Sequence, residues 1–197
     1  MSVPDSWRYR GPVSEGTRTR LHQAALELFE EQGYRRTTAQ GIAVRAGVTE
    51  RTFFRHFADK GEVLFDDESP LLAALLGALR QAPAEEPLLM VVRRGLHAVA
   101  AVLQPERETL RRRSALIAAE PDLQERDLLK AEAWRRAAAA LLRQRQVPAR
   151  EADLATAVGI AAWRSAHDEW LTDRRPTALA RRIDRALDTV AQLHRPG

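Results

Sequence analysis

The chain has 197 residues, 45% of them hydrophobic, which is enough for one sizeable core or for a small domain attached to a larger one. Without cysteine, disulfides and thiolate metal sites are excluded; we find no signal peptide and no run of ~20 apolar residues, so we expect a cytoplasmic protein without a membrane partner. The formal net charge is +4, and residues 1–60 supply +3 of it, a bias that suits contact with a phosphate backbone, although a solvated charged helix gives the same count.

The first predicted element is a helix that begins at Thr17, after a flexible arm over residues 1–15 that is rich in proline and glycine. Its apolar residues recur with helical spacing, and Gly33 supplies the left-handed conformation that ends it. The stripe consists of Leu21, Ala24, Ala25, Leu28 and Phe29. Arg8 and Arg10 in the arm could enter a minor groove, but we favour an unstructured basic tail.

Two short helices are predicted next, on either side of a glycine corner. Thr38 can cap the first, which Gly47 closes, and Thr49 can cap the second. The second helix buries Phe53 and Phe57, which lie four residues apart and therefore on one face. The three helices are expected to share one small core.

The second of these short helices has the properties of a DNA-reading element. Such a helix fits the major groove and docks with its N-terminal residues against base edges. Arg51 and Arg55 lie one turn apart on the exposed face, so both can form hydrogen bonds with guanine. Glu50 can accept a hydrogen bond from the amino group of cytosine, or it can instead stabilise the helix through its charge at the positive end of the helix dipole. The alternative is that this stretch is a structural corner in an unrelated helical bundle and does not bind DNA. We predict a helix-turn-helix DNA-binding domain over residues 16–62.

The stretch LELFEEQGYRRTTAQGIAVRAGVTERTFFRHFADKGEVLF resembles the N-terminal signature of the TetR family of transcriptional repressors. The resemblance implies that the base-facing positions are Gln40, Glu50, Arg51 and Arg55. It implies that the phosphate-facing positions are Thr38, Thr49, Thr52, Phe54, His56 and Lys60. Phe54 is a departure, because the family usually has tyrosine there, so a hydroxyl-to-phosphate bond is absent from this chain.

Residues 63–197 are predicted to form an all-helical domain, because prolines separate segments of helical periodicity and no strand pattern occurs. Two long apolar stripes near the chain end can serve the core or a partner helix. The TetR resemblance implies that this domain binds a ligand and dimerises through its last two helices, at about 150–172 and 177–194 here. It also implies that a small molecule shifts the helix that follows the helix-turn-helix motif, and that this shift changes the distance between the two DNA-binding domains of the dimer.

Large and basic side chains suggest where a ligand would be held. Apolar ligand sites are lined by large hydrophobic side chains, so tryptophans are candidates. For each tryptophan the alternative is ordinary packing in the core. We nevertheless expect at least one of Trp134 and Trp163 to touch a cavity. The arginine run at residues 111–113 could bind phosphates, but we favour a solvated face. The predicted pocket consists of Trp134, Trp163, Leu116 and Arg113. The stretch RRRSALIAAEPDLQERDLLKAEAWRRA resembles a mycofactocin-associated subset of the family, which implies a fatty acyl-CoA ligand.

The sequence therefore predicts a homodimeric regulator that binds double-stranded DNA at a palindromic operator and is released by a small apolar effector. A DNA-binding protein without ligand control and an enzyme on a helical bundle are the alternatives. We identify no catalytic residue, because no nucleophile with a base, no paired carboxylates and no glycine-rich phosphate loop occur. His97 and His167 are isolated, so we predict no metal and no cofactor.

Overall fold

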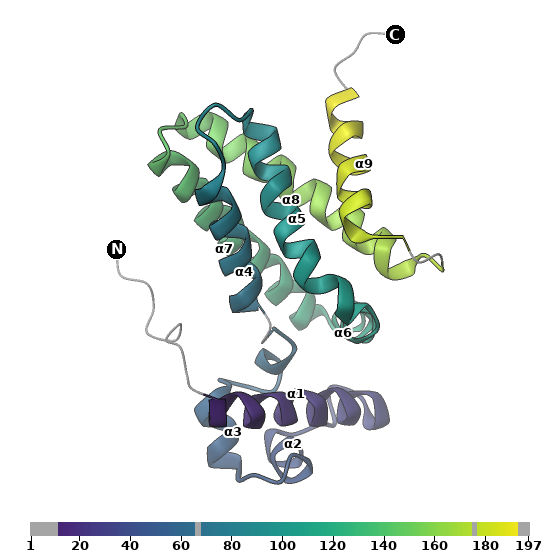
Figure 1. Cartoon of the computed structure of the whole chain (residues 1–197). Helices are drawn as coiled ribbons and strands as arrows, with labels where there is room; N and C mark the ends of the chain where they lie inside the picture. Colours follow the sequence, from purple (N-terminus) through teal and green to yellow (C-terminus); the bar gives the residue numbers. More distant parts are fainter. Residues whose placement is uncertain (1–11, 66–67, 175–176, 193–197) are drawn as a thin grey trace. The chain divides into compact units, whose positions relative to one another are not determined.

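The computed structural model of the chain describes residues 12–65, 68–174 and 177–192, so Arg8 and Arg10 lie outside the described residues. All regular structure in these ranges is helical, which confirms the predicted fold class (Figure 1). The chain divides into two compact units. Unit 1 holds Met1–Ser69 and Arg112–Leu123, and unit 2 holds Pro70–Arg111 and Gln124–Gly197.

Unit 1 is built on three helices and one short 3-10 helix. These are α1 (Pro12–Gln32), α2 (Ala39–Arg45), α3 (Glu50–His56) and η2 (Glu62–Phe65). α1 begins at Pro12 and not at Thr17, so residues 12–15 of the expected arm are helical. Proline favours the first position of a helix because its fixed φ suits the helix and its missing N–H would have no partner there. Gly33 ends α1 with a φ of +86°, as predicted.

The core of unit 1 extends beyond the predicted boundary at residue 62. Val63, Leu64 and Phe65 of η2 are buried against α1, and Leu123 is buried in the same core. The C-terminal half of α6 (Arg107–Ala119) also belongs to unit 1, through two hydrogen bonds of 2.5 Å from Arg112 to Glu30. Helical periodicity identifies an apolar face but does not say which core receives it, so the boundary could not be placed from the sequence.

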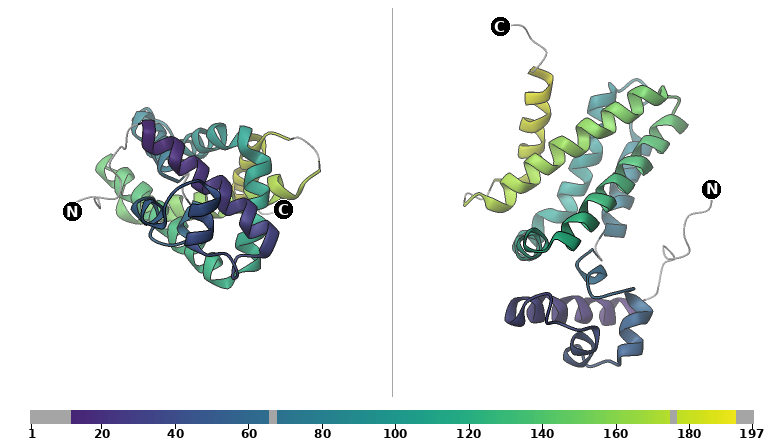
Figure 2. Two further views of the ribbon diagram at one scale, coloured as in Figure 1. Left: turned by 90° about the horizontal axis from the view of Figure 1, so that it is seen from below. Right: turned by 180° about the vertical axis from the view of Figure 1, so that it is seen from behind.

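Unit 2 contains the remaining helices. In chain order they are α4 (Glu68–Gln81) from Pro70, α5 (Leu88–Leu103), η3 (Gln104–Glu106), the start of α6, α7 (Pro121–Gln144) from Gln124, α8 (Ala149–Thr172) and α9 (Leu179–Gln192). α8 packs against both α5 and α9 (Figure 2). The last two helices begin within two residues of the positions expected from the sequence.

Two glycines allow close approach to α5. A Cβ atom on Gly159 of α8 would lie 2.6 Å from Val92 Cγ1, and one on Gly95 of α5 would lie 2.8 Å from Leu75 Cδ1 of α4. The middle of α5 is therefore packed tightly on two sides.

Replacing Gly159 by alanine should destabilise unit 2 by about 1–3 kcal/mol, because the added methyl group overlaps Val92 in a filled interface. Thermal or urea unfolding measures the change. Gly77 of α4 is the matched control, since a Cβ atom there meets nothing within 4 Å. Gly77→Ala should stabilise the helix by about 0.5–1 kcal/mol, and equal effects of the two substitutions would contradict the packing argument.

One 18-residue window within Leu88–Ala119 has a mean hydropathy of 1.2, so by length and composition this stretch could cross a membrane, contrary to the expectation that no such run exists. The 3-10 helix η3 interrupts it, and Arg93 and Arg94 lie within its first half. The apolar face of α5 is buried in the core of unit 2. Burial in a helical core accounts for this hydropathy.

Candidate DNA-binding site

Two threonines and a glycine shape the helix-turn-helix of unit 1. Thr38 Oγ1 accepts a hydrogen bond from Gly41 N–H at 3.0 Å, and Thr49 Oγ1 accepts one from Thr52 N–H at 3.2 Å. Gly47 turns the corner with a φ of +69°. Both predicted helix caps and the predicted corner are thus confirmed. Each cap satisfies an N–H group that the start of a helix leaves without an intrahelical partner.

The inner face of α3 anchors it to the rest of unit 1. Phe53 and Phe57 are buried, with their ring centroids 5.6 Å apart, and the guanidinium of Arg18 lies 4.8 Å from the centre of the Phe57 ring. On α2, Arg45 pairs with Glu27 and Glu31 of α1. These contacts hold both short helices against α1, and the sequence indicated only the phenylalanines.

The outer face of the motif carries all four predicted base-facing residues. Gln40, Glu50, Arg51 and Arg55 are exposed. Within the described ranges, the side chains of Gln40, Glu50 and Arg51 form no hydrogen bond or ion pair with other protein groups. An arginine that is exposed and unpaired near a helix N-terminus can bond the O6 and N7 atoms of guanine together. Arg51 therefore meets the geometric requirement for base recognition.

An exposed apolar side chain on α2 was missed by the sequence reasoning. Val44 is 71% exposed although the rest of its helix packs inward through Ile42 and Ala43. An apolar side chain on a DNA-facing helix can contact a thymine methyl group or the sugar wall of the groove. Nothing in the apolar periodicity distinguishes such a residue from a core residue.

The predicted phosphate-facing residues divide into two groups. Thr38 and Thr49 are exposed, and the hydroxyls of Thr49 and Thr52 lie 2.9 Å apart. Phe54 is 52% exposed and packs edge-on against Phe53. These side chains lie where solvent or a phosphate can reach them.

His56 and Lys60 are placed differently from the sequence prediction. Both ring nitrogens of His56 are buried. Lys60 Nζ donates to the carbonyl oxygens of Tyr34 at 2.7 Å, Thr37 at 2.9 Å and Arg35 at 3.3 Å, and it lies 4.4 Å from the centre of the Tyr34 ring. Burial lowers the pKa of the Lys60 ammonium, while the charge of Glu120 acts in the opposite direction. Lys60 thus closes the loop between α1 and α2, and its contact with a phosphate stays a prediction.

Replacing Phe54 by tyrosine should strengthen DNA binding about threefold on operator and random DNA alike, because one added phosphate bond carries no sequence information. Fluorescence anisotropy with both DNAs measures the two affinities. Phe54→Leu is the control, since it changes packing without adding a hydroxyl. A gain on the operator alone would show that this position reads a base.

The four residues of the predicted ligand pocket do not share one core. Arg113 lies over the Phe65 ring at 5.1 Å and Leu116 packs on the core of unit 1, whereas Trp134 and Trp163 pack on the core of unit 2. The pocket of these four residues stays a prediction. Arg113 and Leu116 lie on α6, Trp134 lies on α7 and Trp163 lies on α8.

The arginine run at residues 111–113 shows why consecutive helical residues do not make one site. Arg111 is exposed and pairs with Glu108, Arg112 binds Glu30, and Arg113 lies over an aromatic ring. Successive side chains on a helix point about 100° apart. The three guanidinium groups hence do not converge on one phosphate.

Comparison with known families decides the classification. The family model described as "Bacterial regulatory proteins, tetR family" matches residues 21–66, which cover the motif described above. The family model described as "MftR C-terminal domain" matches residues 86–195, more than half of the chain. The chain belongs to the TetR family. It is a helix-turn-helix transcriptional regulator.

Individual relatives of this TetR-family regulator support both parts of the match. It is 28% identical over 176 residues to the regulator MftR of Mycobacterium tuberculosis, covering 86% of this chain and 87% of MftR. It is 42% identical over 98 residues to TcmR of Streptomyces glaucescens, where the match spans half of this chain but only 43% of TcmR. Among solved structures, FadR of Thermus thermophilus, a TetR-family repressor in complex with lauroyl-CoA, is 25% identical with a TM-score of 0.55, covering 91% of this chain and 96% of FadR.

Proposed function

We propose that the protein is a cytoplasmic, homodimeric repressor that binds a palindromic operator through Arg51 and Arg55. The observation that carries this proposal is the exposed outer face of α3, on which Arg51 has no competing partner among the described residues. A two-fold dimer presents two such helices to successive major grooves, which lie about 34–36 Å apart. Gln40 and Glu50 assist at neighbouring bases, and Thr38, Thr49 and Thr52 set the register on the phosphates.

We further propose that an acyl thioester with an apolar chain releases the repressor from DNA. The MftR-type match over residues 86–195 and the lauroyl-CoA complex of the related FadR support this ligand class. Within unit 2, Trp134 of α7 and Trp163 of α8 are half-buried large side chains that pack against the core, and side chains of this kind line apolar ligand sites. Trp163 also stacks on His167, with ring centroids 5.2 Å apart, which gives the site an aromatic wall.

The C-terminal helices support dimerisation in the same proposal. α8 exposes a row of apolar residues at helical spacing, formed by Leu154, Ala157 and Ala161, with Leu154 64% exposed. An exposed apolar row on a helix is typical of a face that another helix covers.

Ligand control is tested by measuring operator binding and thermal unfolding with lauroyl-CoA, with lauric acid and with coenzyme A. Lauroyl-CoA should raise the melting temperature and weaken operator binding by at least tenfold, because a ligand shifts DNA affinity only by its preference for the non-binding state. Lauric acid alone and coenzyme A alone should both have much weaker effects. No thermal shift with any of the three would contradict the proposed ligand class, and a shift without DNA release would contradict its regulatory role.

A DNA-binding protein without ligand control is the second candidate. It would bind a palindromic site but would show neither thermal stabilisation by metabolites nor release. An enzymatic function is not proposed, since the relatives named above are transcriptional regulators.

A further inference from the structure

Arg36 lies in the loop between α1 and α2 of unit 1, and its side chain is exposed. Two of its neighbours face inward: Tyr34 packs on Phe29, with ring centroids 5.2 Å apart, and Thr37 is buried. Thr38, two residues further along, is exposed and caps α2. Arg36 and Thr38 thus both present their side chains to solvent immediately before the helix-turn-helix.

The guanidinium of Arg36 is held at one nitrogen. Its Nε donates a hydrogen bond of 2.6 Å to the carbonyl oxygen of Gln32, the last residue of α1. Its two terminal nitrogens have no hydrogen-bond or ion-pair partner among the described residues. Because the stem is already fixed, a contact through the terminal nitrogens costs less side-chain entropy. Arg36 therefore presents positioned N–H donors of the kind that bind phosphate oxygens.

The other lysine and arginine side chains of residues 35–60 have other contacts or other proposed roles. Arg35 and Arg45 each pair with a carboxylate of unit 1, with nitrogen-to-oxygen distances of 3.0 and 2.7 Å. Lys60 donates to three main-chain carbonyl oxygens, which occupies all the donors of an ammonium group. The two arginines of α3 are proposed to read bases. Arg36 is the cation of this stretch that these contacts and roles leave available for a phosphate.

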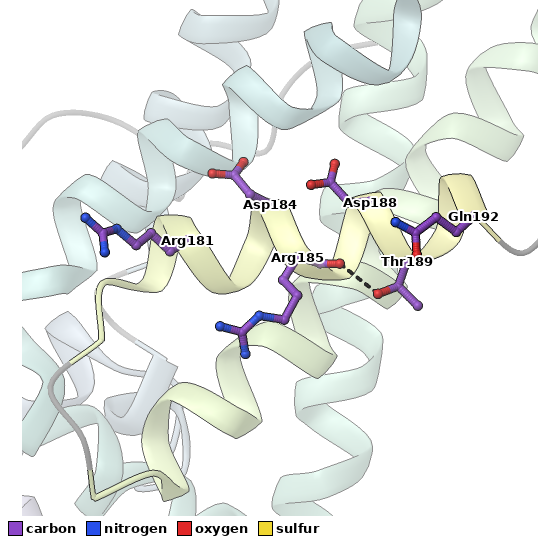
Figure 3. A pocket seen from close by; sticks show the side chains of 6 residues that line it. All are labelled: Arg181, Asp184, Arg185, Asp188, Thr189 and Gln192. Atoms are coloured by element: carbon purple, nitrogen blue, oxygen red, sulfur yellow. Dashed lines mark hydrogen bonds between the residues drawn. The ribbon is translucent and has the colours of Figure 1, made fainter.

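Exposure by itself does not identify a phosphate contact. Arg181 and Arg185 of α9 are exposed as well, but they belong to unit 2 and share an open groove of about 380 Å³ with two aspartates (Figure 3). A phosphate in that groove would meet carboxylates together with the guanidinium groups. Arg36 differs because it adjoins the helix-turn-helix and forms no ion pair with a carboxylate among the described residues.

We propose that Arg36 binds a phosphate of the DNA backbone beside the phosphate that Thr38 contacts. Two residues span at most about 7 Å of chain, so the two side chains reach the same phosphate or neighbouring ones. The inference rests on the proposed DNA-binding function and adds a cation to phosphate contacts that are otherwise made by threonine hydroxyls. A cation at a phosphate raises the affinity for every DNA sequence alike, because it displaces counterions and reads no base.

The substitution Arg36→Gln in the full-length chain tests this contact through the salt dependence of DNA binding. The slope of log affinity against log salt concentration should become shallower by about 0.9 for each copy bound, hence by about two for a dimer. Affinity at a fixed physiological salt concentration should fall about tenfold on operator and scrambled DNA alike. A loss confined to the operator would assign Arg36 to a base and overturn the proposal.

Two further variants separate the charge of Arg36 from its bond to Gln32. Arg35→Gln makes the same change at the adjacent residue, whose charge already pairs with Glu120, and should leave the slope unchanged. Arg36→Lys restores a cation but not the Nε donor, and should keep the slope of the wild type. If Arg36 only stabilised the end of α1, Arg36→Lys and Arg36→Gln would have equal slopes, and this result would overturn the proposal.

Uncharged methylphosphonate linkages, placed one at a time in the operator, locate the contacted phosphate. At that position the neutral linkage should weaken binding of the wild type severalfold but add no further loss to Arg36→Gln, since the contact is already missing. Losses that add fully at every position would overturn the contact. Thermal unfolding of each variant confirms that the compared chains are folded.

The outcomes distinguish failure of this inference from failure of the proposed function. A wild-type chain that binds all sequences equally overturns operator recognition, while the salt slope on random DNA still tests Arg36. A chain that selects its operator but keeps the wild-type slope after Arg36→Gln overturns the Arg36 contact alone. Equal reductions of the slope by Arg35→Gln and Arg36→Gln overturn it as well, because they would reflect net charge only.

Discussion

Replacing Arg51 by alanine should lower affinity for the operator by about 10- to 100-fold while leaving affinity for random DNA nearly unchanged. One guanidinium that bonds guanine at two atoms accounts for about 1–3 kcal/mol of discrimination against other bases. Arg51 is exposed on α3 and has no partner in the described part of the chain, so its loss should not disturb the fold. The expected result is therefore a loss of specificity.

Quantitative footprinting at fixed salt, with operator and scrambled duplexes, measures both affinities. Arg136→Ala is the matched control, because this exposed arginine of α7 pairs with Glu132 in unit 2 and does not belong to the helix-turn-helix. A uniform loss on both DNAs would assign Arg51 to a phosphate instead of a base. A fall in melting temperature would indicate a structural role.

Replacing Lys60 by methionine should destabilise unit 1 by about 2–3 kcal/mol, because three carbonyl oxygens lose a charged donor together. The methionine keeps much of the aliphatic stem and removes the ammonium. Chemical denaturation, followed by the fluorescence of Tyr34 or by hydrogen exchange in α1 and α2, reports the loss. The lowered pKa of Lys60 predicts in addition that unit 1 gains stability as pH rises from the folded pKa toward the ordinary value for lysine, since the unfolded chain binds more protons there.

The other lysine of the chain provides the control for this prediction. Lys130→Met makes the same chemical change on α7 and should alter stability by less than about 1 kcal/mol. The slope of DNA affinity against salt should be the same for folded Lys60→Met and for the wild type. If the slope of DNA affinity against salt concentration fell by about one counterion while stability stayed unchanged, Lys60 would contact a phosphate, as the family resemblance implied.

The features predicted correctly from the sequence are those that depend on near neighbours along the chain. Helix caps at Thr38 and Thr49, glycine stops at Gly33 and Gly47, and the pair Phe53 and Phe57 act within one or two helical turns. Their chemistry can be recognised without knowing the rest of the fold, because each choice of residue has a local cause.

The features that could not be predicted depend on distant partners. Lys60 lies 23 and 26 residues from two of the carbonyls that hold it, so its sequence position suggests DNA contact while the fold gives it an internal role. Arg113 and Leu116 lie on a helix whose two halves belong to different units. For the buried Thr37, whose hydroxyl lies 2.9 Å from the Gly33 carbonyl, no sequence signal distinguished it from its exposed neighbour Thr38.

The tight packing around α5 limits which residues unit 2 can accept at two positions. Val92 already meets the backbone of α8 at Gly159, and Leu75 meets α5 at Gly95, so larger side chains at these glycines would be rejected. Gly77 of α4 differs, because a Cβ atom added there meets nothing within 4 Å. A sequence that keeps this helical core should therefore accept a larger residue at position 77 but retain glycine at positions 95 and 159.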